Sequence, residues 1–68
     1  MGEAEEIAIR TRAQDLAESG EYEGFNVLSA TLDTEFGAVA VDVVRRDTPF
    51  RDALTDTCQA AWARRRSR

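Results

Sequence analysis

Residues 38–44 read Ala-Val-Ala-Val-Asp-Val-Val, and this stretch decides which of two folds the chain adopts. Its valines alternate from Val39 to Val43 as in a half-buried strand, and β-branched side chains favour strands. A period of 3.6 residues instead gathers Ala40 and Val44 on one face of a helix. Taken alone, the stretch slightly favours a strand, which would need a partner strand earlier in the chain.

The segment before this stretch has a helical pattern. Its large apolar residues follow one another at steps of three and four positions, which places them on one stripe of a helix, whereas a strand would scatter them over both faces. The spacing predicts a helix over about 24–36, which Gly37 would end. The residues of the stripe are Tyr22, Phe25, Leu28, Leu32 and Phe36.

The beginning of the chain also predicts a helix, over residues 3–19. Ile9, Ala13 and Leu16 recur at helical spacing, and the acids at the start of the segment suit the positive end of the helix dipole. Gly20 would stop this helix, because glycine takes the left-handed conformation without a steric cost.

The last part of the chain has the clearest helical signals. Asp47 is a candidate N-cap, and Pro49 suits a first helical turn, where its missing N–H costs nothing. An apolar stripe then runs toward the terminal arginines, which suit the negative end of the helix dipole. Its members are Phe50, Leu54, Cys58, Ala61 and Trp62. We therefore predict an all-α domain of three to four helices; the alternative is an α+β fold, helix–β-hairpin–helix, with strands near 26–32 and 38–44.

Two short motifs carry a resemblance to known proteins. Residues 12–20 read Arg-Ala-Gln-Asp-Leu-Ala-Glu-Ser-Gly, and residues 51–58 read Arg-Asp-Ala-Leu-Thr-Asp-Thr-Cys. Over about residues 9–61, this pattern resembles a group of short uncharacterised bacterial proteins with Arg-Ala-x-x-Leu-Ala-x-Ser-Gly and Arg-x-x-Leu-x-x-x-Cys segments. The resemblance implies an all-helical fold and no particular activity. The valines of 38–44 and the pair Arg45-Arg46 depart from the group's pattern, which leaves the strand alternative open.

Charge is sorted along the chain. The formal net charge is −4, and four of the nine basic residues lie within the last five positions. Without them, thirteen acidic residues face five arginines, so that the rest of the chain carries −8. We expect one small domain over 1–63 and a short basic tail over 64–68. A domain of this size buries only about 60% of the surface of its unfolded chain, so that binding a partner would stabilise it.

The composition argues against catalysis. The chain has no His and no Lys, which removes two of the side chain types most used for acid–base chemistry near neutral pH. Its single cysteine, Cys58, falls on an apolar stripe without a His to activate it, and we expect it in the core. Asp52 and Asp56 share a helical face, but two carboxylates supply too few oxygens for a hard cation. We predict no enzyme, no catalytic or metal-binding residues, no cofactor and no small-molecule substrate.

The aromatic residues point to a protein partner. A small domain has little interior in which to bury them, so that some should remain at the surface as a contact patch, and tryptophan is enriched at binding hot spots. We predict a small non-catalytic interaction module or accessory subunit that binds another protein, with a homodimer as the simplest assembly. The candidate partner-binding residues are Tyr22, Phe36, Trp62, Arg64, Arg65, Arg66 and Arg68.

Two alternatives involve nucleic acid. Six glutamates in the first third of the chain would form an acidic face that imitates nucleic acid, as in small inhibitors of phage origin. The arginines of 64–68 would instead bind phosphates and release counterions, although the acidic body repels polyanions.

The sequence also bears on location. No run of apolar residues approaches the ~20 that a membrane-spanning helix needs, and the acidic start is unlike a secretory signal. We therefore expect a cytoplasmic protein with no membrane partner.

Overall fold

The computed structural model of the protein describes residues 2–67 and has four α-helices and no strand within that range. The helices are α1 (Glu3–Glu18), α2 (Phe25–Phe36), α3 (Ala38–Arg46) and α4 (Thr48–Arg66). The predicted all-α fold is confirmed. The α+β alternative, with strands near 26–32 and 38–44, is wrong, because both segments lie in helices.

The stretch that favoured a strand forms α3 because only its helical face can be buried. Ala40, Val41 and Val44 are buried, whereas Val39 is exposed. The preference of valine for strands spans about 1 kcal/mol in all, whereas full burial of a single valine contributes at least ~1.5 kcal/mol. Gly37 separates α2 from α3 with a φ of 94°, which lets the chain turn and lay α3 against α2.

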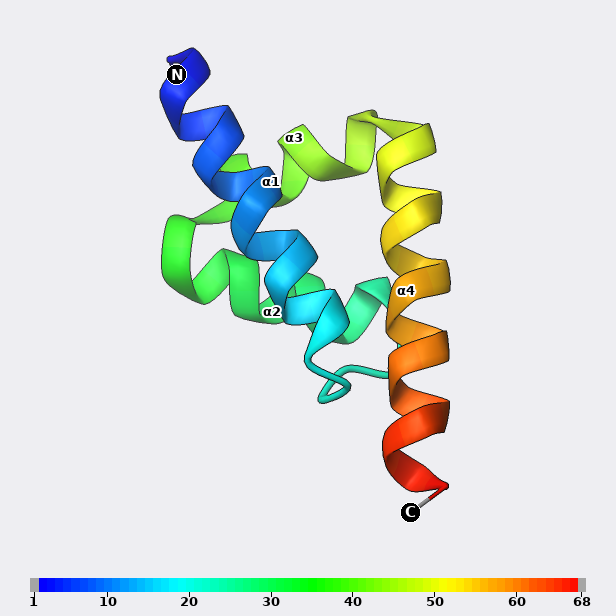
Figure 1. Ribbon diagram of the computed structural model, residues 1–68. Helices are drawn as coiled ribbons and strands as arrows, with labels where there is room; N and C mark the ends of the chain where they lie inside the picture. The colour runs from blue at the N-terminus through cyan, green and yellow to red at the C-terminus, as the bar shows by residue number, and fades with distance from the viewer. Residues whose placement is uncertain (1, 68) are drawn as a thin grey trace.

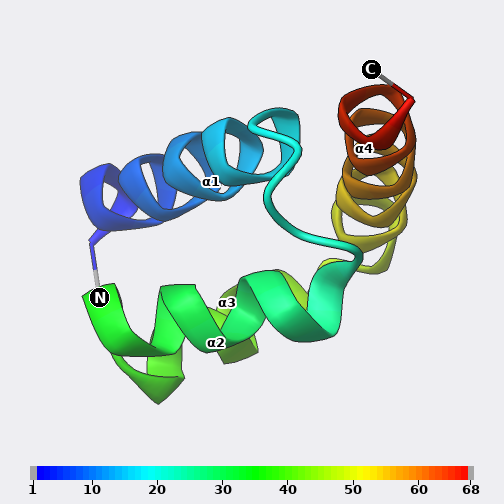
Figure 2. The same ribbon diagram turned by 90° about the horizontal axis from the view of Figure 1, so that it is seen from below.

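The four helices form two layers that α4 closes on one side. α1 lies across α2 and α3, and α4 runs along the side of the molecule (Figure 1). Seen from below, α1 lies opposite α2 and α3, and α4 is viewed nearly along its axis (Figure 2). α1 begins at the opposite end of the molecule from the last turn of α4 (Figure 1).

The core contains one face of every helix. Small residues lie among the buried positions of α1 and α4, which allows these helices to approach one another closely. Tyr22 and Phe50 are half-buried and pack against the core. The buried apolar residues are Ile9, Ala13, Leu16, Ala17, Phe25, Leu28, Leu32, Ala40, Val41, Val44, Leu54, Cys58 and Ala61.

Gly20, just after the end of α1, packs closely against α4. Its φ is 79°, in the left-handed region, and a Cβ atom added to it would lie 3.0 Å from the carbonyl oxygen of Ala61. Arg65 packs over the same glycine, donates a hydrogen bond to the carbonyl oxygen of Ser19 at 3.3 Å and pairs with Glu21 at 3.7 Å. The predicted helix stop at Gly20 is confirmed, and it is also a contact with α4.

Two ion pairs connect α1 to the rest of the molecule. Arg12 makes two parallel hydrogen bonds to the carboxylate of Glu35 at the end of α2, at 2.9 and 3.0 Å. Arg10 pairs with Asp47 at the junction of α3 and α4, and its guanidinium lies 5.2 Å from the centre of the Phe50 ring. The hydrogen bonds from the arginines lower the pKa of both carboxyl groups.

Asp47 also caps α4, as the sequence predicts. Its side chain accepts a hydrogen bond from the backbone N–H of Phe50 at 3.4 Å, and Pro49 lies in the first turn. The same carboxylate therefore starts α4 and holds Arg10 of α1.

Substitution of the glycines should separate backbone strain from crowding. We expect Gly20→Ala to lower the free energy of unfolding by about 1–3 kcal/mol, because it combines a left-handed backbone with a contact against the Ala61 carbonyl. Gly37→Ala should lower the free energy of unfolding by less. Its φ is also positive, so that the backbone strain remains, but its added Cβ would meet nothing within 4 Å. Gly24→Ala has neither problem and serves as the control. Urea unfolding followed by circular dichroism measures all three, and equal losses in all three variants would contradict this account.

The pair between Arg10 and Asp47 should make stability depend on pH. The folded-state pKa of Asp47 is lowered. The contribution of its ionised carboxylate to the stability of the fold is therefore fully present above the ordinary aspartate pKa of 3.8 and is lost as the pH falls through the folded-state pKa. Asp47→Asn keeps a capping side chain but removes the charge. The wild-type protein should therefore exceed this variant in stability at pH 6–7, and the difference should shrink below about pH 4. Urea unfolding across this range tests it, with Asp56→Asn on the exposed side of α4 as the control; a difference independent of pH would refute it.

Candidate functional site

The three aromatic residues predicted to bind a partner lie in different surroundings. Phe36 ends α2 and is 43% exposed. Tyr22 lies half-buried in the connection between α1 and α2, and its hydroxyl accepts a hydrogen bond from Thr31 at 3.2 Å. Trp62 is half-buried on α4, where the guanidinium of Arg66 lies 5.5 Å from the centre of its ring. Of the three, Phe36 presents the most open side chain.

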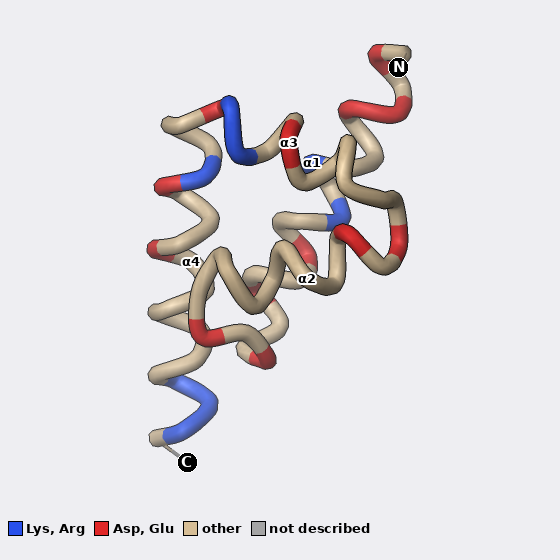
Figure 3. The backbone as a smooth tube through the Cα atoms, turned by 180° about the vertical axis from the view of Figure 1, so that it is seen from behind, with Lys and Arg blue, Asp and Glu red and all other residues tan. Residues whose placement is uncertain are grey.

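The basic residues at the end of the chain form the last turn of α4. Arg64, Arg65 and Arg66 are exposed, and this end of the helix favours cations, as predicted. Arg65 is held against the end of α1, and Arg66 stacks on Trp62. Arg68 lies outside the described residues. Basic positions gather at both ends of α4 (Figure 3), because the arginines of α3 and of the first turns of α4 lie at its other end.

Three exposed apolar residues belong to segments at one end of the molecule, which we call the apolar end: Ile7 in the first half of α1, and Phe36 and Val39 on either side of the junction between α2 and α3. Ile7 and Val39 are 57% and 58% exposed. The first half of α1 and the junction between α2 and α3 lie at the same end in both views (Figures 1 and 2). The sequence analysis missed Ile7 and Val39; the signal was that each lies off the buried stripe of its own helix.

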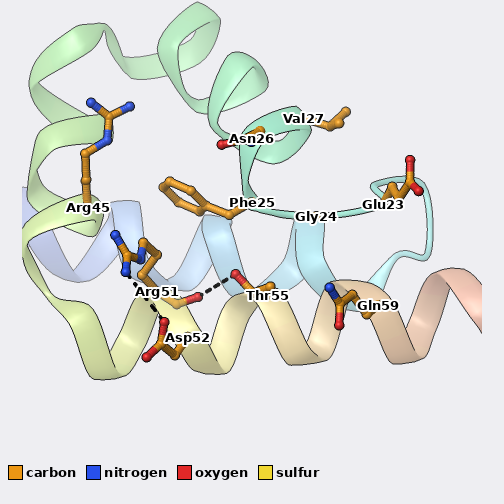
Figure 4. A pocket seen from close by; sticks show the side chains of 10 residues that line it. All are labelled: Glu23, Gly24, Phe25, Asn26, Val27, Arg45, Arg51, Asp52, Thr55 and Gln59. Carbon is orange, nitrogen blue, oxygen red and sulfur yellow. Dashed lines mark hydrogen bonds and ion pairs between the residues drawn. The ribbon is translucent and has the colours of Figure 1, made fainter.

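A groove runs between the start of α2, the end of α3 and α4 (Figure 4), with a volume of about 550 Å³. Arg45 and Arg51 lie at the end of the groove beside the Phe25 ring, and Glu23 and Gln59 lie at its other end. The groove is lined by Glu23, Gly24, Phe25, Asn26, Val27, Arg45, Arg51, Asp52, Thr55 and Gln59. Sequence reasoning did not predict it, because three separate segments form it.

The groove contains charged and hydrogen-bonding side chains. Arg51 pairs with Asp52 at 3.7 Å, and the hydroxyl of Thr55 donates to the carbonyl oxygen of Arg51 at 3.0 Å. Arg45 has no ion-pair partner within residues 2–67. The guanidinium groups of the two arginines supply N–H donors that can bind an anion.

Cys58, the only cysteine, is fully buried on α4, as predicted. Burial raises the pKa of its thiol, which disfavours the reactive thiolate. Within residues 2–67, nowhere do three His, Cys, Asp or Glu side chains gather in a way that could hold a metal ion. None of the four helices combines the length and apolar character needed to cross a membrane.

Comparisons of this chain with protein-family models, with curated proteins and with solved structures find no significant match.

The burial of Cys58 should make thiol labelling a measure of unfolding. We expect Ellman's reagent to react slowly with the native protein and at the rate of a free thiol in concentrated urea, because labelling requires both access and the thiolate. The control is a variant with Ala60→Cys and Cys58→Ala. Its thiol is exposed, two residues further along α4, and should react at once. Fast labelling of native wild-type protein would contradict the burial of Cys58 in solution.

Proposed function

We propose that this protein is a small non-catalytic interaction module that binds another protein chain through the apolar end. The single observation that supports this proposal is the exposure of Ile7, Phe36 and Val39 at one end of a molecule whose other large apolar side chains are mostly buried. Scattered exposed apolar residues are ordinary, but several at one end of a small domain are typical of a contact surface.

The surroundings of Phe36 and Val39 support the same proposal. The six residues 36–41 read Phe-Gly-Ala-Val-Ala-Val and form the uncharged run between Glu35 and Asp42. Its side chains at 36, 38 and 39 are exposed and those at 40 and 41 are buried, so that the surface is attached directly to the packed interior. The bidentate pair of Arg12 with Glu35 holds the end of α2 in place. A rigid surface loses less conformational entropy on binding than a mobile one.

A second copy of the chain is the simplest partner. Closed two-fold dimers are the commonest oligomers, and in such a dimer each apolar end would cover the other. Covering these side chains would add buried apolar area, which a domain of this size lacks on its own.

The nucleic-acid alternatives have less support from the geometry. The six glutamates of the first third divide between the two ends of α1, and Glu5 and Glu18 stand about 20 Å apart along the helix, so they do not form one acidic face. Of the basic residues near the end of α4, Arg65 is already bound to the end of α1.

Replacement of the apolar end should prevent assembly. We expect the wild-type protein to sediment as a dimer, or as a complex with a host protein, at micromolar concentration, and Phe36→Ser with Val39→Ser to weaken that association by tenfold or more. Val27→Ser is the matched control, because Val27 is 49% exposed on α2 but lies at the other end of that helix. Trp62→Ala tests whether Trp62 takes part in the association, as the sequence predicts. Analytical ultracentrifugation measures the masses, and circular dichroism verifies folding.

The outcomes separate clearly. A wild-type monomer that captures the same host proteins as the Phe36 and Val39 double variant would refute this function. Equal weakening by Val27→Ser would assign the association to general hydrophobicity instead of the apolar end.

A further inference from the structure

Arg45 and Arg51, from two different helices, line the same end of the groove, and their guanidinium groups point apart (Figure 4). Arg45 lies in the last turn of α3 and Arg51 near the start of α4, and both lie beside the Phe25 ring (Figure 4). Among residues 2–67, Arg45 has no ion-pair partner, and Arg51 has only a 3.7 Å contact with Asp52, whose side chain is 68% exposed. Both arginines therefore keep N–H donors for an incoming anion.

The rest of the groove is suited to an uncharged segment. Phe25 supplies an apolar wall beside the arginines, and Thr55 and Gln59 supply neutral polar groups; the Val27 side chain points away from Phe25 (Figure 4). From Arg51 to Gln59 the floor follows eight residues of α4, which is about 12 Å of helix. That length accommodates about four residues of extended peptide.

The charges in the groove favour a peptide over a nucleic acid. Glu23 stands at the end away from the two arginines, and Asp52 lies beside Arg51. A nucleic acid would bring a phosphate to every position and would meet these carboxylates as well as a domain with a negative net charge. A peptide with a single carboxylate places its charge only where the arginines are. Arginine binds a carboxylate through two parallel hydrogen bonds, which fixes the position of the peptide as well.

We propose that the groove binds a short acidic segment of a partner protein in extended form, with one carboxylate bound by Arg45 and Arg51 and an apolar side chain against Phe25. The residue that reaches Glu23 is neutral or basic. This inference rests on the proposed interaction function only in that the partner is a protein. The surface is a different one, so that substitutions at the apolar end should leave it intact.

The test uses the full chain labelled with ¹⁵N and the peptide acetyl-Glu-Leu-Ser-Lys-amide. Titration should produce saturable shifts of backbone amides around the groove, in residues 23–27 and 51–59 and at Arg45. Arg45→Gln and Arg51→Gln should each weaken binding by about tenfold, as expected for the loss of one hydrogen-bonded charge. Arg46→Gln is the matched control: it removes the same charge from the neighbouring exposed residue, which does not line the groove, and should change binding less than twofold.

Titrations with other ligands identify the chemistry that the groove recognises. Acetyl-Gln-Leu-Ser-Lys-amide lacks the carboxylate and should bind at least tenfold more weakly than the acidic peptide. Sodium phosphate and a single-stranded oligonucleotide, each at matched ionic strength, should shift these amides less than the peptide does. Equal effects of Arg45→Gln and Arg46→Gln, or equal binding of the two peptides, would overturn the proposal, and so would stronger binding of phosphate or of the oligonucleotide.

The two proposals fail independently. Phe36→Ser with Val39→Ser should leave peptide binding unchanged, and Arg45→Gln should leave the sedimenting mass unchanged. Loss of peptide binding in the apolar-end variant, with its fold intact, would show that the groove is not a separate site.

Discussion

The approach of α1 to α4 at Gly20 and Ala61 sets the frame of this molecule. A side chain at Gly20 would meet the carbonyl oxygen of Ala61, so that the two helices can come this close only where α1 ends in a glycine. Small buried residues on both helices continue the contact. With α1 held on α4, the pair of α2 and α3 covers the remaining apolar faces, and the chain buries a core in spite of its length.

Ion pairs set the position of the helix ends around that core. Arg12 and Glu35 connect the middle of α1 to the end of α2, and Asp47 joins the start of α4 to Arg10. Such exposed pairs contribute little to stability individually, but they select one arrangement of the helix ends. Those ends carry both proposed binding surfaces, since the apolar end lies where α2 meets α3 and the groove lies where α3 meets α4. α3 therefore contributes to both surfaces, through Val39 and Arg45.

Both proposed binding surfaces consist of ordinary charged, polar and apolar side chains. The only thiol is buried, and the groove is lined by arginines, carboxylates, hydroxyl and amide groups. The three aromatic residues predicted to bind a partner differ in exposure. Tyr22 and Trp62 are half-buried against neighbours, and Phe36 is exposed at the end of α2. The chain thus concentrates its exposed apolar area in aliphatic side chains and one phenylalanine.

Local patterns in the sequence determined three of the four helices and their ends. Steps of three and four residues, the cap at Asp47 and the glycines at 20 and 37 act through neighbouring residues, so that they are visible without the fold. The state of residues 38–44 was not decided locally, because alternating valines suit a strand, and only burial against neighbouring helices selects the face that contains Val44. Tertiary structure alone decided the exposure of Ile7 and Val39, and it alone brought Phe25, Arg45 and Arg51 together, since no sequence period relates residues on three different helices.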